Sequence, residues 1–261
     1  MSVKKTRKRK KATVNRFIRK IIVLFLNGEW SGLWNYIQTE SANIFHVYNL
    51  INRPKILFCP ICKYSAKSFE HLSNSQSISW NSACQNCNSR SRHRGLFFLY
   101  HDYLKSSKEL KILHFAPEPI LEGELRKYTN HKYFTTDYNM LEVDYLNEDI
   151  QQLSFDNSSF DLILINHVLE HVPNDKIALM ELSRILKPRG VAIITIPGDW
   201  RKQLTIHFNH LGFNGHYRDY GLDIINIMKE NFSLVSKRSL YIYNGKKHGI
   251  KPMETAFLCY K

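Results

Sequence analysis

The amino-acid sequence predicts an α/β protein with a mostly parallel sheet, preceded by a small cysteine-rich module. From Leu110 onward, short apolar runs alternate with helical stretches, and before that point four cysteines lie in two closely spaced pairs. Hydrophobic residues make up 43% of the chain and charged residues 23%, which is typical of globular proteins. With 261 residues, the chain has room for one full α/β domain and a small appendage.

The first 20 residues hold most of the positive charge. They contain ten lysines and arginines and no acidic residue, whereas the formal net charge of the whole chain is +14, so the rest of the chain carries only +4. Basic segments of this kind are either solvated arms or arms that bind a polyanion. Both interpretations stay open for residues 1–20, with an anionic membrane surface or RNA as the partner.

A helical segment is predicted for residues 21–54. The apolar residues between Phe17 and Leu26 are spaced with basic ones as in a basic amphipathic helix, which rests on a membrane surface or packs onto the protein's own body. The apolar run from Ile21 to Leu26 is far shorter than the roughly 20 residues that cross a bilayer. We therefore expect a cytoplasmic protein without a transmembrane span, with peripheral attachment at the inner face of the membrane as an option.

Residues 55–94 form the predicted cysteine-rich module. Cys59 and Cys62 make one pair, Cys84 and Cys87 make the second, and 21 residues separate them. Two such turns can direct four thiolates at one ion and complete the tetrahedral shell of structural zinc. Disulfides are disfavoured because no secretion signal is visible, and an iron–sulfur cluster is a minor alternative. The pattern predicts a zinc ribbon whose ion has a structural role.

A basic cluster follows the last of these cysteines, with Arg90, Arg92, His93 and Arg94. Such a cluster either recognises an anionic group, for example a phosphate or an acidic sugar, or pairs with carboxylates that hold the module to the next domain. Both interpretations stay open.

The remainder, residues 95–261, forms the predicted main domain. The expected strands are Lys111 to Phe115, His131 to Asp137, a short one near Val143, Phe160 to Asn166, Val191 to Pro197, Ser233 to Tyr241 and Ala256 to Tyr260. The expected helices are Glu118 to Tyr128, Asp175 to Leu186 and Gly221 to Glu230. This alternation favours βαβ units, and the absence of a helical stretch between the last two strands predicts a terminal hairpin.

Acidic residues at strand ends indicate a ligand site, because open α/β sheets bind ligands at the carboxyl ends of their strands. Asp137 closes the second strand about 20 residues after the first loop, where nucleotide-binding folds place a carboxylate on ribose hydroxyls. Asp149 is positioned to accept a hydrogen bond from an adenine amino group. Each acid taken singly is more often a turn or cap residue.

An ordered set of motifs carries a family resemblance: Glu148 to Phe155, Asn157 to Asp161, His167 to Val172, and Leu182 to Gly190. Together these segments resemble the type-11 subgroup of class I S-adenosylmethionine-dependent methyltransferases over roughly residues 110 to 200. The resemblance implies a Rossmann-like seven-stranded sheet that uses S-adenosyl-L-methionine. It also implies that Asp137 binds the ribose, that Asp149 and Ile150 bind the adenine, and that Asn166 and His167 lie beside the methionine end.

The first loop departs from this family, which normally has glycine there. The chain reads Ile112-Leu-His-Phe-Ala-Pro-Glu-Pro119 without any glycine. Together with the basic cluster, this loop resembles a bacterial subgroup in which it replaces the glycine-rich one. The resemblance implies a cofactor-binding role for His114 and Ala116, and it makes Glu118 a candidate to hold the methionine ammonium.

Methyl transfer from a sulfonium needs alignment of donor and acceptor more than acid catalysis. A hydroxyl acceptor would also need a base, and the candidates are His171, Glu170 and His167, for which a capping or core role is the alternative. The segment after the fifth strand is rich in polar aromatic residues. It predicts substrate contacts from His216, Arg218 and Tyr220, with an ordinary loop as the alternative.

Three classes of function compete for this sequence. The first is a methyltransferase acting on a small molecule or a glycan. The second is an RNA methyltransferase, since one bacterial family that methylates ribosomal RNA joins a four-cysteine ribbon to this fold. The third is a non-catalytic zinc-ribbon scaffold with a Rossmann-like shape. The near-balanced charge outside the basic arm favours the first over the second.

Overall fold

The computed structural model describes residues 19–30, 32–34, 36–38, 40–41, 57–73, 78–105, 108–208, 212 and 215–261. The chain divides into two compact units, Met1–Ser91 with Lys247–Gly249, and Arg92–Lys246 with Ile250–Lys261. Most of the predicted basic arm lies outside the described residues, as do residues 42–54 of the predicted helical segment. Both of these predictions therefore stay open.

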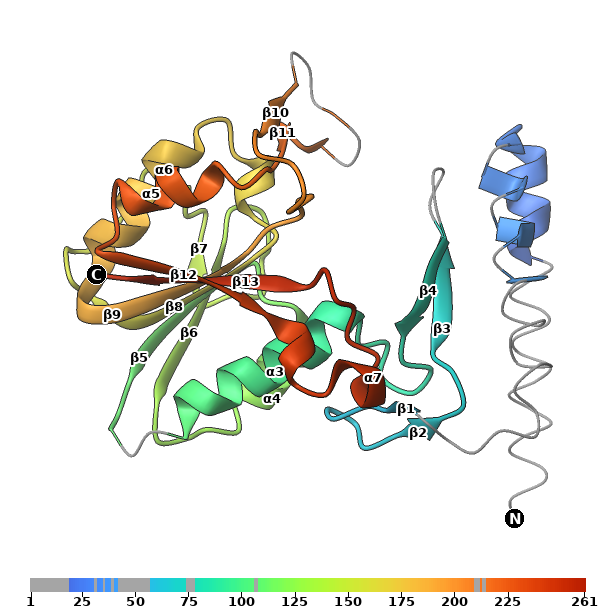
Figure 1. Cartoon of the computed structure of the whole chain (residues 1–261), viewed down its shortest axis with the longest axis horizontal. Helices are drawn as coiled ribbons and strands as arrows, with labels where there is room; N and C mark the ends of the chain where they lie inside the picture. Colours follow the sequence, from blue (N-terminus) through green and yellow to red (C-terminus); the bar gives the residue numbers. More distant parts are fainter. Residues whose placement is uncertain are drawn as a thin grey trace. The chain divides into compact units, whose positions relative to one another are not determined.

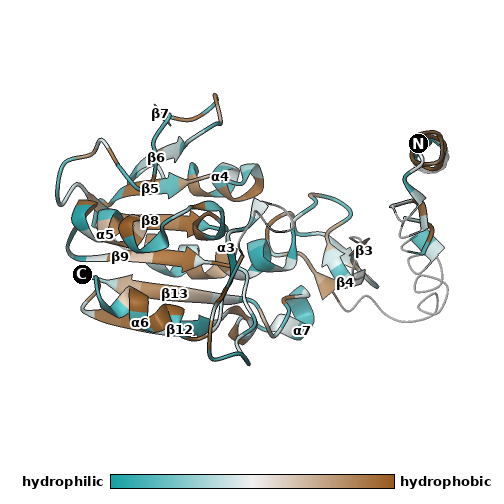
Figure 2. Ribbon diagram, turned by 90° about the horizontal axis from the view of Figure 1, so that it is seen from above, coloured by the Kyte–Doolittle hydropathy of each residue, from teal (hydrophilic) through white to brown (hydrophobic). Residues whose placement is uncertain are grey.

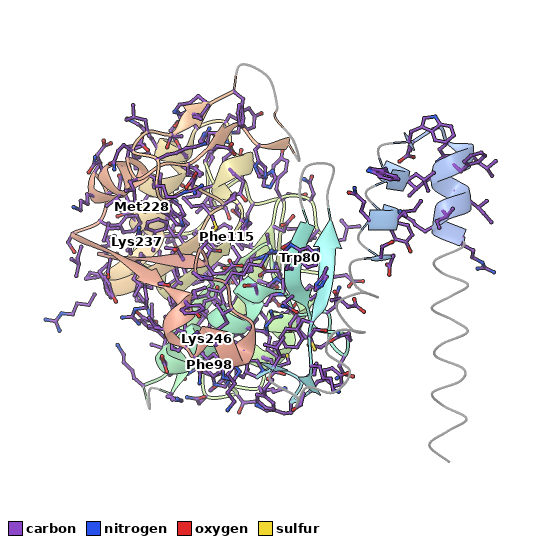
Figure 3. All side chains as sticks on the ribbon, turned by 45° about the vertical axis from the view of Figure 1, so that its right-hand side comes forward. Trp80, Phe98, Phe115, Met228, Lys237 and Lys246 are labelled. Atoms are coloured by element: carbon purple, nitrogen blue, oxygen red, sulfur yellow. The ribbon has the colours of Figure 1, made fainter. Side chains whose placement is uncertain are left out.

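The described part of the first unit contains helical segments and two small hairpins. Residues 19–26 are helical, with Leu24 buried and Leu26 exposed, and residues 32–34, 36–38 and 40–41 are also helical. The hairpins pair β1 (Leu57–Phe58) with β2 (Ser65–Ala66), and β3 (Glu70–Ser73) with β4 (Ile78–Ala83). The ring of Trp80 on β4 is half exposed (Figure 3). None of the helices among the described residues combines the length and apolar composition that crossing a bilayer requires.

The second unit is built on a seven-stranded sheet in the order β12-β13-β9-β8-β5-β6-β7, which Figure 2 shows from above. Neighbouring strands from β9 to β7 run parallel, whereas β13 runs antiparallel to both β9 and β12. The strands are β5 (Lys111–Phe115), β6 (Lys132–Asp137), β7 (Tyr145–Leu146), β8 (Phe160–Asn166), β9 (Leu186–Thr195), β12 (Leu234–Ser239) and β13 (Thr255–Tyr260). The predicted α/β fold class and mostly parallel sheet are confirmed.

Helices cover both faces of this sheet. In Figure 1, α5 (Asp175–Ile185) and α6 (Ile224–Lys229) lie on one face, and α3 (Ser91–Leu104) and α4 (Pro119–Leu125) lie on the other. The sequence starts α4 with a proline, whose missing N–H has no helical partner to lose at that position. It starts α5 with Asn174, whose side chain accepts a hydrogen bond from the N–H of Ile177 at 3.3 Å.

The core lies between the central strands and the helices α5 and α6. Strand β8 has six buried residues out of seven, which is the continuous apolar pattern of a strand covered on both faces. The core also includes Phe115 from β5 and Met228 from α6, both labelled in Figure 3. Burial of the central strands fixes their register, and this sets where their carboxyl ends meet.

The structure differs from the prediction between the last two strands. A 3-10 helix (Leu240–Ile242) and the one-turn helix α7 (Gly245–His248) lie there, where no helical stretch is expected from the sequence. Elements of one turn carry no readable periodicity, so the sequence pattern could not reveal them. A short two-stranded hairpin, β10 (Ile206–His207) with β11 (Arg218–Asp219), also adds to the loop after β9.

Candidate functional site

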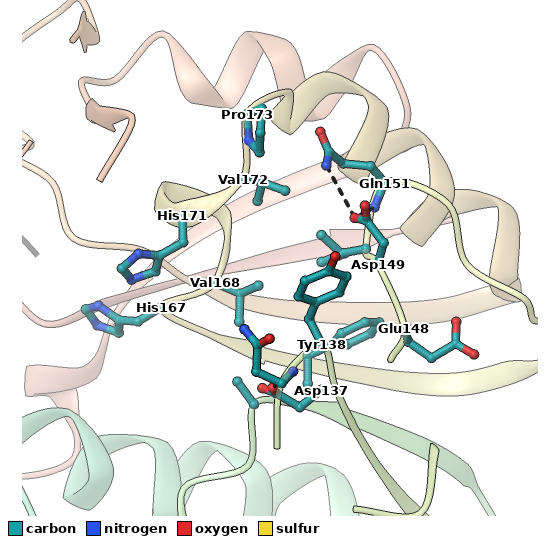
Figure 4. Close-up of a pocket in the computed structure, with 14 residues that line it drawn as sticks. Asp137, Tyr138, Glu148, Asp149, Gln151, His167, Val168, His171, Val172 and Pro173 are labelled. Carbon is teal, nitrogen blue, oxygen red and sulfur yellow. Dashed lines mark hydrogen bonds between the residues drawn. The ribbon is translucent and has the colours of Figure 1, made fainter. Parts of the chain in front are cut away.

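A pocket of about 580 Å³ lies where β5, β6 and β8 end. In Figure 4, His167 and His171 lie at one end of it, Asp149 and Gln151 at the other, and Asp137 and Tyr138 between them. It is lined by Phe115, Ala116, Asp137, Tyr138, Asn139, Glu148, Asp149, Ile150, Gln151, His167, Val168, His171, Val172 and Pro173. Five of the eight predicted cofactor residues line it: Ala116, Asp137, Asp149, Ile150 and His167.

Asp137 and Asp149 each use one carboxylate oxygen to hold a loop. The backbone N–H groups of Asn139 and Met140 donate to Asp137 Oδ1 at 2.7 and 2.8 Å. The backbone N–H of Gln151 donates to Asp149 Oδ1 at 2.8 Å. Because these bonds involve only Oδ1, the Oδ2 atom of each acid is available to a ligand in the pocket. Both side chains are therefore preorganised acceptors.

The glycine-free first loop makes its turn with an alanine. Ala116 has a φ of 45°, in the left-handed region that favours glycine, and its N–H donates to Thr136 O at 2.9 Å. His167, at the end of β8, has a φ of 54° and donates from its N–H to Thr195 O at 2.9 Å. A non-glycine residue in this region costs about 1 to 2 kcal/mol. Both strained residues line the pocket, which is where such strain tends to gather.

His114, Glu118 and Asn166 lie outside the pocket lining, in a buried polar cluster. Asn166 Nδ2 donates to Glu118 Oε2 at 2.8 Å and lies 3.2 Å from His114 Nε2. The other ring nitrogen of His114 lies 2.7 Å from Tyr133 Oη, and Tyr100 Oη donates to Asn166 Oδ1 at 2.8 Å. His114 is fully buried and Asn166 is 3% exposed. Their predicted contact with the cofactor stays a prediction.

Glu118 is an ionised carboxylate surrounded by basic side chains. Burial acts to raise the pKa of Glu118, but the hydrogen-bonding contact and charge of His114, with the charges of His93 and Arg92, lower it to about 2. Arg92 Nε and His93 Nε2 both lie 3.6 Å from Glu118 Oε1. For these two residues the structure favours the carboxylate-paired interpretation of the basic cluster. Arg94 is fully buried, so it is not presented to an anionic ligand.

The position of Glu118 leads to a specific prediction. If its carboxylate attracts the methionine ammonium, Glu118→Gln should weaken binding of S-adenosylmethionine about tenfold to a hundredfold, because a hydrogen bond to a charged group contributes about 1.5 to 3 kcal/mol. Binding of adenosine, which lacks the ammonium, should change little. Calorimetry with both ligands measures this, and equal losses for the two would assign Glu118 to packing of the buried cluster.

The three predicted base candidates come together at the end of β8. Glu170 and His171 lie in a 3-10 helix (Leu169–His171), and Glu170 is only 1% exposed. His167 Nδ1 lies 3.2 Å from Glu170 Oε1, and His171 Nε2 lies 4.0 Å from it. His167 and His171 line the pocket, whereas the buried Glu170 is not among the lining residues. Their catalytic role stays a prediction, and their geometry places a buried carboxylate against an imidazole that faces the pocket.

Two of the predicted substrate residues have a different role from the one expected. Arg218 is 3% exposed and donates to the carbonyl oxygens of Val172 and Pro173 at 2.8 and 2.6 Å. Tyr220 is 1% exposed and its hydroxyl donates to Asp175 Oδ2 at 3.0 Å, where Arg218 Nη1 also lies at 2.9 Å. In this conformation neither side chain can contact substrate. They hold the loop after β9 against the start of α5.

His216, the third predicted substrate residue, is accessible. Its ring lies against that of His171, with 4.8 Å between centroids and an interplanar angle of 82°. Burial lowers the pKa of His216, and the charge of Glu170 opposes this only in part. A neutral imidazole beside the pocket is therefore favoured at neutral pH. The sequence could not place His216 next to His171, because 44 residues separate them.

The four cysteines of the first unit converge. Cys59 Sγ lies 3.7 Å from Cys87 Sγ, and Cys62 Sγ lies 3.6 Å from Cys84 Sγ. All four sulfurs lie within 4.8 Å of one another, and none forms a disulfide. Sulfurs bound to zinc at about 2.3 Å in a tetrahedron are about 3.8 Å apart, so the spacing fits a metal ion. The contact with the side chain of Cys84 lowers the pKa of Cys59 and so favours its thiolate form, the form that binds metal.

The two cysteine pairs repeat one backbone turn. The N–H of Lys63 donates to Cys59 O at 3.0 Å, and the N–H of Asn88 donates to Cys84 O at 2.8 Å. Lys63 and Asn88 each follow the second cysteine of a pair and have φ values of 60° and 58°. Left-handed residues at these equivalent positions let each turn aim both of its sulfurs to one side. The two cysteine pairs therefore have the same local backbone geometry.

The sequence analysis missed several pocket residues, although they neighbour the residues it named. Tyr138 and Asn139 follow Asp137, Glu148 precedes Asp149, and Val172 with Pro173 follows His171. Tyr138 is 60% exposed, and a half-free aromatic ring at the mouth of a pocket can stack on a flat ligand ring. A large exposed aromatic directly after a strand-end acid was a signal that could have been used.

The second unit thus has a Rossmann-like α/β fold, with a final strand antiparallel to its neighbours and a pocket at the carboxyl ends of its parallel strands. Within this unit, residues 121–194 match the family model described as a methyltransferase domain.

Individual relatives are similar to parts of the chain. A demethylmenaquinone methyltransferase from Staphylococcus carnosus is 38% identical over 55 residues, which are 21% of this chain and 23% of that protein. The 1,6-didemethyltoxoflavin-N1-methyltransferase of Burkholderia thailandensis superimposes on 65% of this chain and 78% of its own, with 14% identity and a TM-score of 0.48. An S-adenosylmethionine-dependent methyltransferase from Mesorhizobium loti superimposes on 64% of this chain and 98% of its own, with 10% identity and a TM-score of 0.46.

Proposed function

We propose that this protein transfers a methyl group from S-adenosylmethionine to a small-molecule or glycan acceptor. The observation that carries the proposal is the pocket itself. Two acids, Asp137 and Asp149, line it at different strand-end loops, and each keeps one carboxylate oxygen for a ligand. A nucleoside with a ribose and an adenine offers hydroxyl donors at one end and an amino donor at the other, and carboxylates such as these accept hydrogen bonds from both kinds of donor.

The residues present fit this cofactor. Asp137 would accept hydrogen bonds from ribose hydroxyls, Asp149 and Ile150 would contact the adenine, and the left-handed turn at Ala116 lets backbone approach the ligand. Bound S-adenosylmethionine supplies a methyl group on a positively charged sulfur. The protein's own contribution is to hold the acceptor in line with that group and to exclude water from the pocket.

The acceptor is proposed to enter beside His167 and His171. The charge of Glu170 Oε1, 3.2 Å from His167 Nδ1, favours a proton on Nδ1 and leaves Nε2 as the ring nitrogen for a proton from the acceptor. A small molecule or glycan is favoured over RNA because the chain outside residues 1–20 carries a net charge of only +4. The partly matching relative from Staphylococcus carnosus is also named for a small-molecule substrate.

The proposal is tested first by calorimetry with S-adenosylmethionine and S-adenosylhomocysteine, for which we expect binding at one site per chain. Release of S-adenosylhomocysteine is then followed with hydroxylated small molecules, glycans and total RNA as separate acceptors. Turnover with RNA alone would reject the proposed acceptor class. If neither S-adenosylmethionine nor S-adenosylhomocysteine binds, the proposal of an enzyme is rejected and the hypothesis of a non-catalytic zinc-ribbon scaffold remains.

We further propose that Cys59, Cys62, Cys84 and Cys87 hold one structural zinc ion. The support is the distance between sulfurs and the repeated turn around each pair. With four protein ligands the ion would have no open position for water or substrate, so its contribution would be to the stability of the first unit.

A further inference from the structure

Glu170 is a buried carboxylate that accepts no hydrogen bond from the residues that the structure describes. It is 1% exposed, and although His167 Nδ1 lies 3.2 Å from Oε1, neither Oε1 nor Oε2 has a hydrogen-bond partner there. A buried carboxylate normally accepts several hydrogen bonds or binds a metal ion, because removing its charge from water is costly. The proposed methyl transfer does not itself require a buried acid. Glu170 therefore calls for a positively charged ligand.

His171 presents a ring nitrogen toward this carboxylate. Its Nδ1 lies 3.3 Å from the carbonyl oxygen of Gly215, while its Nε2 lies 4.0 Å from Glu170 Oε1. A proton on Nδ1 that is donated to a carbonyl leaves the Nε2 lone pair free, and metal-binding histidines are commonly oriented in this way. The contact with Gly215 thus selects the tautomer that binds a cation.

His216 completes the group from a distant part of the chain. The ligand atoms of Glu170, His171 and His216 all lie within 4.8 Å of one another. The backbone N–H of Tyr217 donates to Glu170 O at 2.8 Å, and the buried Arg218 holds the same segment through its contacts with residues 172, 173 and 175. The position of His216 beside the carboxylate is therefore built into the fold.

From this geometry we propose that Glu170, His171 and His216 bind one divalent metal ion at the histidine end of the pocket. Two imidazoles and one carboxylate suit borderline ions such as zinc, manganese or ferrous iron. Ligand atoms around an ion bound at about 2.1 Å are roughly 3 to 4 Å apart, so a small rotation of the two imidazole rings closes the site. Three protein ligands leave positions open, which is the pattern of a catalytic and not a structural site.

The site also specifies the acceptor class, and this part of the inference rests on the proposed function. An ion held by Glu170, His171 and His216 would have an open position for an oxygen of the acceptor and would lower the pKa of that hydroxyl group. The proton passes to His167 or to water. The oxygen then bonds to the methyl carbon while the carbon–sulfur bond breaks, and that electron pair remains on the sulfur. The acceptor class is therefore a hydroxylated compound.

Manganese is the best probe, because the sulfur ligands of the ribbon disfavour it. The full-length, zinc-loaded chain is titrated with Mn²⁺, and free Mn²⁺ is followed by electron paramagnetic resonance. We expect one bound Mn²⁺ per chain. Glu170→Gln and His216→Ala should each weaken binding at least tenfold, since even residues that only orient ligands commonly change metal affinity by about 10- to 100-fold.

His207→Ala is the matched control, because His207 is an exposed histidine in the same loop region, on β10. It should leave Mn²⁺ affinity unchanged. Thermal melting without metal checks that the variants fold, and His216→Ala, at a more accessible position, carries the test if Glu170→Gln does not fold. No bound Mn²⁺, or equal affinity in all variants, overturns the site.

Calorimetry with S-adenosylmethionine on the same samples separates the two proposals. Mn²⁺ binding without S-adenosylmethionine binding would keep the metal site and reject the proposed function. S-adenosylmethionine binding without Mn²⁺ binding would reject the metal site alone.

Discussion

Replacing Cys84 and Cys87 together with serine is expected to lower zinc content from about one ion per chain to near zero and to unfold the ribbon. The four sulfurs are spaced as a tetrahedral site requires, and two ligands cannot hold the ion alone. Structural zinc contributes about 10 kcal/mol or more to the folding of small zinc modules. Elemental analysis measures the metal, and proteolysis of the first unit measures the loss of folding.

Cys259→Ala provides the control for this experiment. Cys259 is fully buried on β13, and burial raises the pKa of its thiol, so it offers no thiolate to a metal. The variant should retain its zinc. Protein purified without chelator that contains no zinc, or a double variant that keeps it, would contradict the assignment.

Replacing Asp137 with alanine or asparagine is expected to weaken S-adenosylmethionine binding about tenfold to a hundredfold. Hydrogen bonds from ribose hydroxyls to a carboxylate contribute about 1.5 to 3 kcal/mol, which corresponds to this range. The two variants differ in whether they keep the contacts that Asp137 makes with its own loop. Asparagine keeps an Oδ1 atom that can accept the N–H groups of Asn139 and Met140, whereas alanine removes the loop contacts together with the charge.

A loss of similar size in both variants, by calorimetry, would assign the effect to the ligand. Tight binding by Asp137→Asn with weak binding by Asp137→Ala would show instead that Asp137 only shapes its loop. Asp156→Ala, which removes an exposed acid outside the pocket, is the control and should bind like the wild type.

The pattern of apolar residues was sufficient to predict the central strands of the sheet, because these strands are buried on both faces. The predicted strand from Phe160 to Asn166 coincides with β8, and the predicted strand from Lys111 to Phe115 coincides with β5. The cysteine spacing was equally informative, since a pair of cysteines two residues apart can form a metal-binding turn through local geometry alone. Asp137 and Asp149 were found because strand ends could be located first.

Other features depended on parts of the chain that meet only in the folded protein. Ala116 takes a left-handed conformation that its residue type does not predict, because the backbone bond to Thr136 on the neighbouring strand holds it there. Arg218 and Tyr220 are of residue types that commonly bind substrates, yet both are buried against the start of α5.

The sequence by itself thus determined the α/β class, the order of most strands along the chain, the convergence of four cysteines and the acids at the strand ends, because each of these follows from local periodicity or spacing. Only the tertiary structure decided that Glu170 is buried, that His216 lies against His171, and that Glu118 is surrounded by His114, His93 and Arg92. Apart from the contact between Glu118 and His114, which are four residues apart, these contacts join segments far apart in the chain. Packing of the loops and helices around the sheet determines them, and local sequence patterns carry no record of it.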